Sequence, residues 1–366
     1  MSQAPTPQPA TGTDILWSDP ARASQFTTWL AQIAPSHGLY IPSLRLASAD
    51  ASFRRYFRID SFSGNLDKGQ SPISLIIMDA PPDKENCQPF VKVAALMQAA
   101  GIHAPQVLAW DEAQGFLLLT DLGAQTMMQV IKRAEPQVNL PLYLQAVDAL
   151  IAWQLSSKPN VLPPYDDALL NRELALFPDW YITQHKGMAI DEAMRFTLDN
   201  TFKQIIATNL VQPSVFVHRD FMPRNLMVGE RLGVLDFQDA VYGPITYDIA
   251  SLMRDAFLSW EEDFCLDVTI RYWEKARKAG LPVGNDFGEF YRGVEWMGLQ
   301  RHLKVAGIFA RLTLRDGKPQ YLADTPRFIN YIRSTCARYR ELKPLLRLVD
   351  KLEGIVEPDI FGFGRQ

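Results

Sequence analysis

Cysteine is scarce in this chain, and its three cysteines, Cys87, Cys265 and Cys336, are odd in number and far apart. This spacing provides neither a disulfide framework nor a paired-cysteine metal site, so a reducing cytoplasm is the expected location. A strong excess of charge is also missing, because the formal net charge is only −4. The overall balance gives no electrostatic case for a nucleic-acid partner, which usually leaves a basic footprint.

Long apolar runs are absent too, and no stretch approaches the ~20 apolar residues that a membrane-spanning helix needs. The first 14 residues, MSQAPTPQPATGTD, have no basic region and no apolar region, so they are predicted to be a disordered tail and not a secretory signal. No repeat occurs at the periods of solenoids or propellers. A soluble protein without a membrane partner is expected, and its 366 residues predict two lobes.

Two composition regimes divide the rest of the chain. In residues 15–121, strands are predicted at 53–59, 74–78, 106–110 and 116–120, with one helix at about 86–99. In residues 122–366, helices are predicted at about 142–155, 192–208, 247–257, 290–312 and 326–339, with short strands at 215–218, 225–228 and 233–237. The predicted fold class is therefore α+β, with a small β-rich N-lobe that contains one helix and a larger, mainly helical C-lobe.

The segment 218–225 reads HRDFMPRN and matches the kinase catalytic loop H-R-D-x-x-x-x-N. Phosphoryl transfer needs a carboxylate beside the attacking hydroxyl and a separate oxygen ligand for magnesium, and one loop can bring both to the γ-phosphate. Asp220 is therefore predicted as a catalytic residue and Asn225 as a metal ligand. His218 is expected to be a packed, hydrogen-bonded support for this loop and not a proton carrier.

Asp236 follows eleven residues after Asn225, behind the apolar pair Val234-Leu235. A carboxylate at the end of such a strand bridges metal and phosphates in kinases, so Asp236 is predicted as the second magnesium ligand. An H-R-D tripeptide alone occurs by chance, and an Asp at a strand end is often only a turn or cap residue. The ordered combination of loop, apolar strand and Asp-Phe is far more specific than either part.

Together with Tyr247-Asp248, these strings resemble the aminoglycoside phosphotransferase superfamily. The resemblance implies the two-lobed fold of protein kinases, the use of ATP and Mg²⁺, a small-molecule acceptor and an Asp248 that braces the catalytic loop. An ordinary carboxylate at a helix N-terminus is the competing interpretation of Asp248. No A-P-E motif follows Asp236 at the usual distance, so no protein-kinase activation segment is visible.

Three further strings, DASFRRYFR (50–58), MDAPPDKE (78–85) and WMGLQRHLKVAGIFARL (296–312), carry a narrower likeness. They resemble the anomeric kinases that phosphorylate N-acetylmuramate and N-acetylglucosamine in bacterial cell-wall recycling. The resemblance implies transfer to the C1 hydroxyl and a sugar 1-phosphate that a uridylyltransferase would consume. It also makes Arg301, His302 and Lys304 candidate acceptor contacts, with surface or interhelix packing as the alternative.

The phosphate-binding side departs from the kinase pattern. No GxGxxG loop is present, and Asp50-Ala51-Ser52-Phe53-Arg54-Arg55 stands between the first two expected strands instead. Ser52 with its neighbouring backbone amides, and Arg54 or Arg55 with their charge, are predicted to bind the phosphates of the nucleotide. The alternative is a plain hairpin whose arginines point to solvent.

The lysine that pairs with phosphates in kinases is also missing, since Met78 or Asp79 occupies its place on the predicted strand. Glu85 stands near the position of the usual pairing glutamate, although an exposed carboxylate in a first helical turn is the simpler interpretation.

Met222 occupies the position of a second kinase lysine, two residues after Asp220. Arg219 or Arg224 can supply that charge, since a guanidinium pairs well with phosphate oxygens. Arg224 is the better candidate and is predicted as a catalytic residue.

Charge gives a modest indication of the acceptor. From residue 308 to the end, 11 Lys and Arg stand against 7 Asp and Glu, which leaves +4. A carboxylate-bearing sugar suits this bias better than a polycationic antibiotic. Asp239 is a further candidate for hydrogen bonds to sugar hydroxyls. A kinase for an aminoglycoside, choline or homoserine, and a catalytically silent nucleotide-binding protein, are the alternatives.

Overall fold

The computed structural model describes residues 15–49, 53–62 and 72–355, and its contacts divide the chain into two units. The first unit comprises residues 1–124 and 227–238, and the second comprises residues 125–226 and 239–366. Segment 227–238 is counted with the first unit because Val234 N donates to the carbonyl of His103 (2.8 Å) and Arg231 Nη2 to that of Gly101 (2.7 Å).

A five-stranded antiparallel sheet in the order β1-β2-β3-β5-β4 forms the centre of the first unit. Its strands are β1 (Leu39–Ala49), β2 (Arg55–Ser61), β3 (Ile73–Asp79), β4 (Val107–Asp111) and β5 (Phe116–Thr120). Alternate residues of a strand point to the same face, so Phe57, Leu75, Ile77 and Phe116 form one apolar face. The four predicted strands are confirmed, whereas β1 is an addition.

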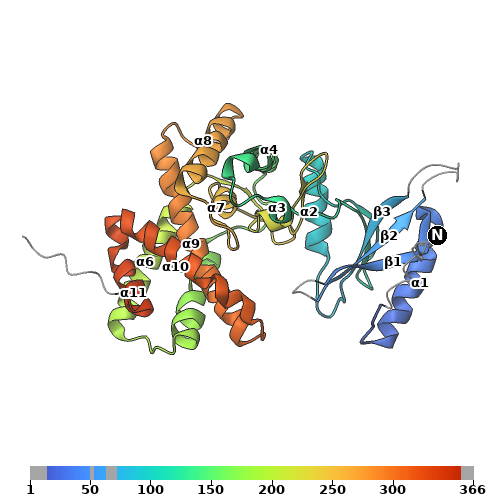
Figure 1. Ribbon diagram of the computed structural model, residues 1–366, viewed down its shortest axis with the longest axis horizontal. Coiled ribbons are helices and arrows are strands. Elements are labelled where there is room, and N and C mark those ends of the chain that lie inside the picture. Colours follow the sequence, from blue (N-terminus) through green and yellow to red (C-terminus); the bar gives the residue numbers. More distant parts are fainter. Residues whose placement is uncertain (1–14, 50–52, 63–71, 356–366) are drawn as a thin grey trace, which may run out of the picture. The chain divides into compact units, whose positions relative to one another are not determined.

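Helix α1 (Pro20–His37) covers this apolar face (Figure 1). Asp19 caps its N-terminus by accepting a hydrogen bond from Ala21 N, and Phe26 and Trp29 pack on the ring of Phe116. Helix α2 (Gln88–Ala99) is the predicted helix of this region. The expectation of only one helix in the N-lobe is therefore wrong, although an Asp-Pro start and a helical spacing of apolar residues were readable.

The second unit is mainly helical, as predicted. Its elements are α3 (Met127–Val130), η1 (Pro136–Asn139), α4 (Leu140–Leu155), α5 (Asp167–Leu174), η2 (Phe177–His185), α6 (Glu192–Leu210), β6 (Ser214–Val217), η3 (Pro223–Asn225), β7 (Leu226–Met227), β9 (Val241–Pro244), α7 (Tyr247–Met253), α8 (Glu262–Lys278), α9 (Phe287–Leu314), η4 (Pro319–Asp324), α10 (Thr325–Arg338), η5 (Arg340–Leu342) and α11 (Lys343–Glu353). Strand β7 ends at Met227, which is counted with the first unit, as is the short strand β8 (Gly233–Val234) that pairs with it. Helices α5, α8 and α11 were not predicted.

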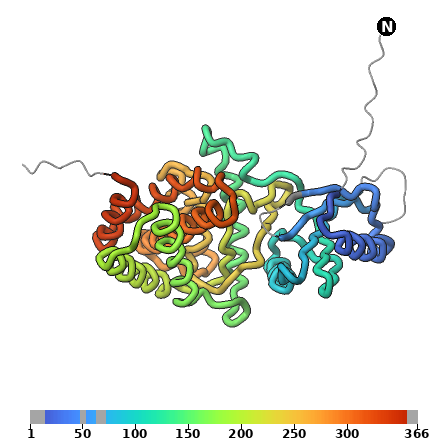
Figure 2. Tube along the Cα trace, turned by 90° about the horizontal axis from the view of Figure 1, so that it is seen from below, coloured from blue at the N-terminus to red at the C-terminus, as the bar shows by residue number. Residues whose placement is uncertain are grey.

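Helix α9 is the longest helix of the described chain, and it packs against α6, α7, α10 and η2. Its approach to η2 depends on Gly307, where a Cβ atom would lie 2.3 Å from the carbonyl oxygen of Leu176. A side chain larger than hydrogen would push the two helices apart. Helices α6 and α11, which are far apart in the sequence, also lie side by side (Figure 2).

Two predicted elements end earlier than expected, for physical reasons. Helix α7 stops at Met253 and not at 257, because Arg254 leaves helical geometry and its side chain bonds to Glu295 and Thr335. Strand β8 ends at Val234 and not at 237, because Asp236 has φ 64, a left-handed conformation that a strand excludes.

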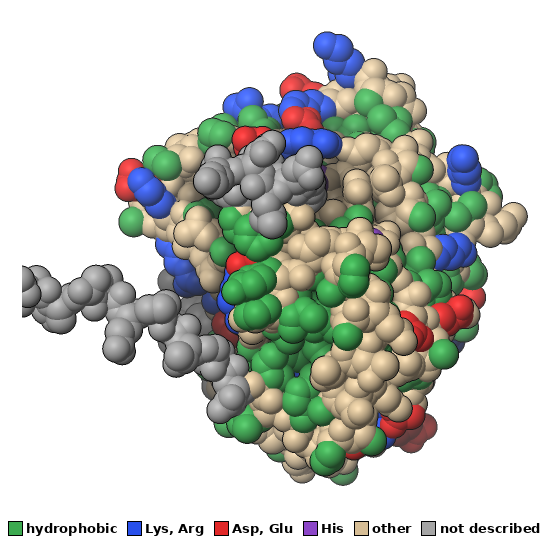
Figure 3. Space-filling model, turned by 90° about the vertical axis from the view of Figure 1, so that its right-hand side faces the viewer, with side chains coloured by type: hydrophobic (Ala, Val, Ile, Leu, Met, Phe, Trp, Pro, Cys, Tyr) green, Lys and Arg blue, Asp and Glu red, His purple; other side chains and the backbone are tan. Residues whose placement is uncertain are grey.

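Among the described residues, none of the helices has the length and apolar character required to cross a membrane. Figure 3 looks onto the first unit, where hydrophobic side chains gather on part of the face and several Lys and Arg side chains lie toward its edges. Large exposed apolar residues of this unit include Tyr40, Ile41, Leu46 and Phe53.

Candidate active site

The predicted catalytic loop begins where β6 ends at Val217. Strand β6 is held by antiparallel pairing with β9, with Phe216 opposite Tyr242. The chain then turns sharply at Arg219, which has φ 77. A positive φ at a non-glycine residue is uncommon and persists only where the surrounding contacts enforce it. The loop is therefore a fixed structure, built on the end of a buried strand.

Asp248, in the first turn of α7, supplies that enforcement. Its carboxylate is completely buried and accepts hydrogen bonds from the backbone N–H of His218 (2.7 Å) and of Arg219 (3.0 Å). Burial raises the pKa of Asp248 to about 7, while these two hydrogen bonds act in the opposite direction. The bracing contact expected from the resemblance is present, and His218 is buried beside it.

Asp220 and Asn225 are brought together by the loop. Asn225 Nδ2 donates to the carbonyl oxygen of Asp220 (2.9 Å), and Asn225 N donates to the carbonyl of Met222 (2.8 Å). Asp220 N in turn donates to Nδ1 of His218 (3.3 Å). These bonds fix the five-residue spacing of the motif as one closed turn.

Arg224 lies between Asp220 and Asn225 in the sequence and is exposed. Its guanidinium carbon is 4.4 Å from the centroid of the Phe257 ring, a cation–π arrangement that keeps the charge at the surface. The side chain is therefore oriented while its charge remains accessible.

Asp236 belongs to the first unit, two residues after β8. It is exposed, and Gln238 Nε2 donates to its Oδ1 (2.8 Å). Its φ of 64 shows that the backbone is held in a strained conformation there, as at Arg219. Residues in such conformations cluster at functional sites.

Arg301 and His302 lie inside the second unit and not on a solvated helix face. Both are buried, and the His302 ring stacks on Tyr331 at 4.6 Å with its Nε2 3.3 Å from the carbonyl oxygen of Arg254. Burial and the nearby arginines lower the pKa of His302 far below its usual value, so the ring is neutral.

Lys304 is buried as well. Its Nζ forms an ion pair with Glu173 (2.9 Å) and lies 3.3 Å from the hydroxyl of Tyr247. Asp239 is exposed, and its carbonyl oxygen is 3.5 Å from Nη1 of Arg219. Among the predicted acceptor residues, Asp239 therefore presents its side chain to solvent.

The two predicted phosphate-binding arginines differ in their contacts. Arg54 Nη2 bonds to Glu85 Oε2 at 3.1 Å, and both side chains are largely buried. Arg55 instead binds Asp79 at 2.6 Å, with its guanidinium 3.9 Å from the Trp17 ring. Ser52 lies outside the described residues.

Glu173 was missed by the sequence analysis. It lies on the unpredicted α5 and binds two charged side chains, Arg219 and Lys304, that are distant in sequence. No local spacing signals such a residue, because these two charged partners are 46 and more residues away in the sequence.

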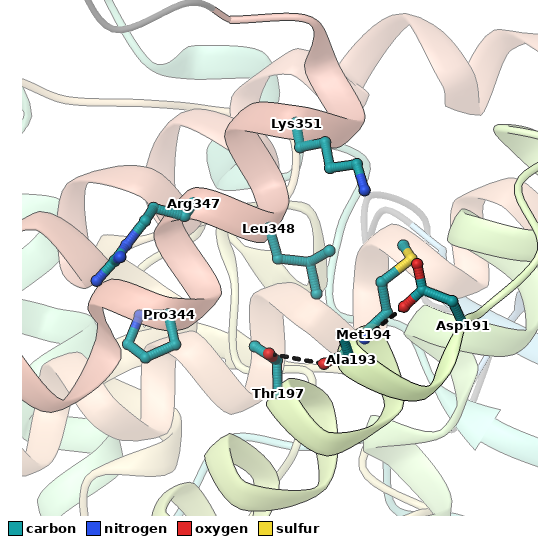
Figure 4. Close-up of a pocket in the computed structure, with 8 residues that line it drawn as sticks. All are labelled: Asp191, Ala193, Met194, Thr197, Pro344, Arg347, Leu348 and Lys351. Carbon is teal, nitrogen blue, oxygen red and sulfur yellow. Dashed lines mark hydrogen bonds between the residues drawn. The ribbon is translucent and has the colours of Figure 1, made fainter.

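A surface pocket of about 330 Å³ lies between α6 and α11 (Figure 4). Its eight lining residues are Asp191, Ala193, Met194, Thr197, Pro344, Arg347, Leu348 and Lys351. None of them belongs to the predicted site.

Within the described part of the chain, no group of three His, Cys, Asp or Glu side chains is arranged to hold a metal ion. A magnesium site at the predicted active site would therefore combine fewer than three carboxylates with other oxygen donors.

The fold and this catalytic loop define a kinase-like phosphotransferase. Residues 43–284 match the phosphotransferase enzyme family, and the chain belongs to that family. The chain is 47% identical over 343 residues to an N-acetylmuramate/N-acetylglucosamine kinase from Pseudomonas aeruginosa, which covers 92% of this chain and 98% of the relative. A protein of the same name from Neisseria meningitidis is 46% identical over 335 residues, 91% of this chain and 96% of the relative. The resemblance read from the motifs is confirmed.

Solved structures give the same fold. An ethanolamine kinase from Plasmodium vivax superposes with a TM-score of 0.60 at 10% identity, covering 92% of this chain and 93% of that one. A choline/ethanolamine kinase family protein from Mesorhizobium loti has a TM-score of 0.57 at 15% identity, covering 90% and 99%. At these identities the likeness shows the fold alone, and the predicted α+β kinase-like fold is confirmed.

Proposed function

We propose that this chain transfers the γ-phosphoryl group of ATP to the C1 hydroxyl of N-acetylmuramate or N-acetylglucosamine. The observation that carries the proposal is the likeness to kinases named for these two sugars, which extends over 92% of the chain at 47% identity. The choice of C1 rests on the motif resemblance. Transfer requires a positioned carboxylate on a fixed loop, and the braced turn around Asp220 supports that requirement.

Asp220 is the proposed catalytic base. Its carboxylate orients the C1 hydroxyl and takes up the proton as the new bond from oxygen to phosphorus forms and the bond to the leaving ADP breaks. An ionised Asp is a weak base, but phosphoryl transfer depends mainly on positioning and charge stabilisation. A hemiacetal hydroxyl is also more acidic than an ordinary alcohol.

Asn225 and Asp236 are the proposed magnesium ligands. Their amide and carboxylate oxygens suit this hard cation. The Nδ2 of Asn225 is directed to the carbonyl of Asp220, so the amide oxygen is the ligand atom that this side chain offers. Bound magnesium would neutralise negative charge on the phosphates.

Arg224 and Arg54 are the proposed cations for the phosphates. Arg224 keeps an exposed guanidinium beside Asn225, where it can stabilise charge on the transferred group. Arg54 is bound to Glu85, which reproduces with arginine the cation–carboxylate pair that kinases build with lysine. Arg55 is a weaker candidate than Arg54. Its Nε and Nη2 both donate to Asp79, and its Nη1 donates to the carbonyl oxygen of Leu16.

As acceptor-binding residues we propose the exposed Asp239 and three buried residues of α9. These three are Arg301, His302 and Lys304. The exposed Asp239 carboxylate can accept hydrogen bonds from sugar hydroxyls. The positive charge of Arg301 and Lys304 favours an acceptor that carries a carboxylate over a polycation. We further propose a cytoplasmic enzyme whose sugar 1-phosphate is consumed by a uridylyltransferase.

The test is incubation with MgATP and, separately, N-acetylmuramate, N-acetylglucosamine, an aminoglycoside, choline and homoserine, followed by phosphorus NMR. We expect a new sugar 1-phosphate resonance with the two amino sugars alone. Phosphate on another hydroxyl would overturn the C1 assignment. Transfer to none of the five, despite ATP binding, would indicate a silent nucleotide-binding protein.

A further inference from the structure

Glu173 holds the side chain of the loop residue that precedes Asp220. The carboxylate lies in the last turn of α5 and is buried. It binds Nη2 of Arg219 at 2.5 Å and Nζ of Lys304 at 2.9 Å, and it accepts a hydrogen bond from the hydroxyl of Tyr165. Two cations and one hydroxyl thus converge on one interior carboxylate.

Arg219 is restrained at both of its ends. Its backbone N–H is bound to Asp248 and its guanidinium to Glu173, while its Nη1 lies beside the carbonyl of Asp239. Its φ of 77 is a conformation that contacts must enforce. Loss of the bond between Glu173 and the Arg219 side chain would remove one of the two restraints on Arg219, the residue next to Asp220.

The charges at this cluster are mutually supporting. Burial alone would raise the pKa of Glu173, yet Lys304 and Arg219 bring that pKa below its usual value. Burial likewise opposes the charge of Arg219, but Tyr247 and Glu173 raise the pKa of its guanidinium. Both partners therefore remain charged at neutral pH, and their bond is charge-assisted in a largely dry environment.

We propose that Glu173 is a positioning residue for phosphoryl transfer, which acts through Arg219 to keep the catalytic loop in its working geometry. Protein kinases commonly order their loops by a new arginine–phosphate pair after phosphorylation. Here the interior carboxylate of Glu173 is the anion that binds the arginine. The inference rests on the proposed kinase function.

The first experiment compares Glu173→Gln with Asp350→Asn. Asp350 is a matched control, because it is also a buried carboxylate of the second unit and pairs with an arginine, Arg333, on helices away from the loop. We expect Glu173→Gln to lower kcat on the order of 10²-fold with little change in the KM for ATP, as misplacement of a catalytic group does. Asp350→Asn should keep the kcat of the native enzyme.

A second pair of variants separates positioning from general stabilisation. Arg219→Met should lose as much kcat as Glu173→Gln, and the double variant should lose no more, because both changes release the same restraint. Glu173→Asp, which keeps the charge, should recover part of the loss. Losses that multiply in the double variant, or a folded Glu173→Gln with native kcat, would overturn the proposal.

Hydrogen exchange provides a readout that does not depend on the acceptor. In Glu173→Gln the amides of His218 and Arg219, now protected by Asp248, should exchange faster, whereas in Asp350→Asn they should not. If the native enzyme phosphorylates neither amino sugar, the proposed function fails, and this exchange comparison still decides the role of Glu173. Unchanged exchange in Glu173→Gln would rule that role out.

Discussion

Two buried carboxylates, one in each unit, have similar surroundings and hold different parts of the chain. Asp79 in the first unit binds Arg22 and Arg55, and Glu173 in the second binds Arg219 and Lys304. The partners of Asp79 come from α1 and β2, so this cluster joins a helix to the sheet. One partner of Glu173 comes from the catalytic loop. The same interior chemistry thus supports the fold in one unit and, we propose, the reaction in the other.

The largest effect expected is that of Asp220→Ala, which tests whether the loop held by Glu173 carries the reaction. Removal of the base should lower kcat on the order of 10³-fold or more, because general-base catalysis contributes about 10²–10⁴-fold and the orienting contact is lost too. Thermal unfolding of the variant should match that of the native protein. Turnover within a few fold of normal would remove Asp220 from the mechanism.

A smaller loss is expected for Arg224→Leu. If this guanidinium stabilises the transferred phosphoryl group, kcat should fall roughly 10- to 100-fold with N-acetylmuramate and N-acetylglucosamine alike. Steady-state rates with both sugars provide the measurement. A loss confined to N-acetylmuramate would instead assign Arg224 to the carboxylate of the acceptor.

Arg54 and Arg55 are neighbours, and substitution of each by Met sharpens the comparison within the first unit. Arg54→Met should raise the KM for ATP roughly tenfold and destabilise the fold less than Arg55→Met does, since the Glu85 side chain is 16% exposed whereas that of Asp79 is not exposed at all. Arg55→Met should leave that KM unchanged and lower the free energy of unfolding by about 1–2 kcal/mol, because Asp79 keeps only Arg22. Urea denaturation and ATP titrations measure both quantities. The reverse pattern would exchange the two roles.

An effect on the pH dependence of stability is expected for a third buried carboxylate, Asp255, whose Oδ2 has no hydrogen-bond partner among the described residues. Burial raises the pKa of Asp255 to about 6, although Arg301 acts in the opposite direction. The unfolded carboxyl titrates near pH 4. Between about pH 4 and 6 the folded state therefore binds the proton more tightly, and this group's contribution to stability falls as pH rises.

Asp255→Asn does not titrate, so its stability relative to the native protein should increase by about 1–3 kcal/mol between pH 4 and 7. Urea denaturation at several pH values in that range measures the change. A stability difference that is independent of pH would show that folding does not change the pKa of Asp255.

The contacts of the candidate site that follow from the sequence depend on local spacing. Asp220 and Asn225 are five residues apart, and the turn that joins them is closed by its own hydrogen bonds. The pairings of Arg54 with Glu85 and of Arg219 with Glu173 join residues 31 and 46 positions apart. Only the tertiary fold determines such pairs, so neither the bond between Arg54 and Glu85 nor the bond between Arg219 and Glu173 was readable from the sequence.

The elements show the same limit. Helix α2 and strand β5 have clear periodicity, and both were predicted. The end of β8 was misplaced because the φ of Asp236 depends on surrounding contacts and not on the apolar residues before it. Helix α1 was missed although its start signals were present, since it lies next to a segment that was assigned as a tail.

The position of α1 has a consequence for the synthesis of the protein. Its apolar side chains, Phe26 and Trp29, are buried against Phe116 of β5, the strand that completes this core. At roughly 5–20 residues per second, the ribosome needs on the order of 4–16 s to proceed from the end of α1 to β5. During that interval the aromatic face of the nascent helix has no native partner from β5, so it is an apolar surface that a chaperone can bind.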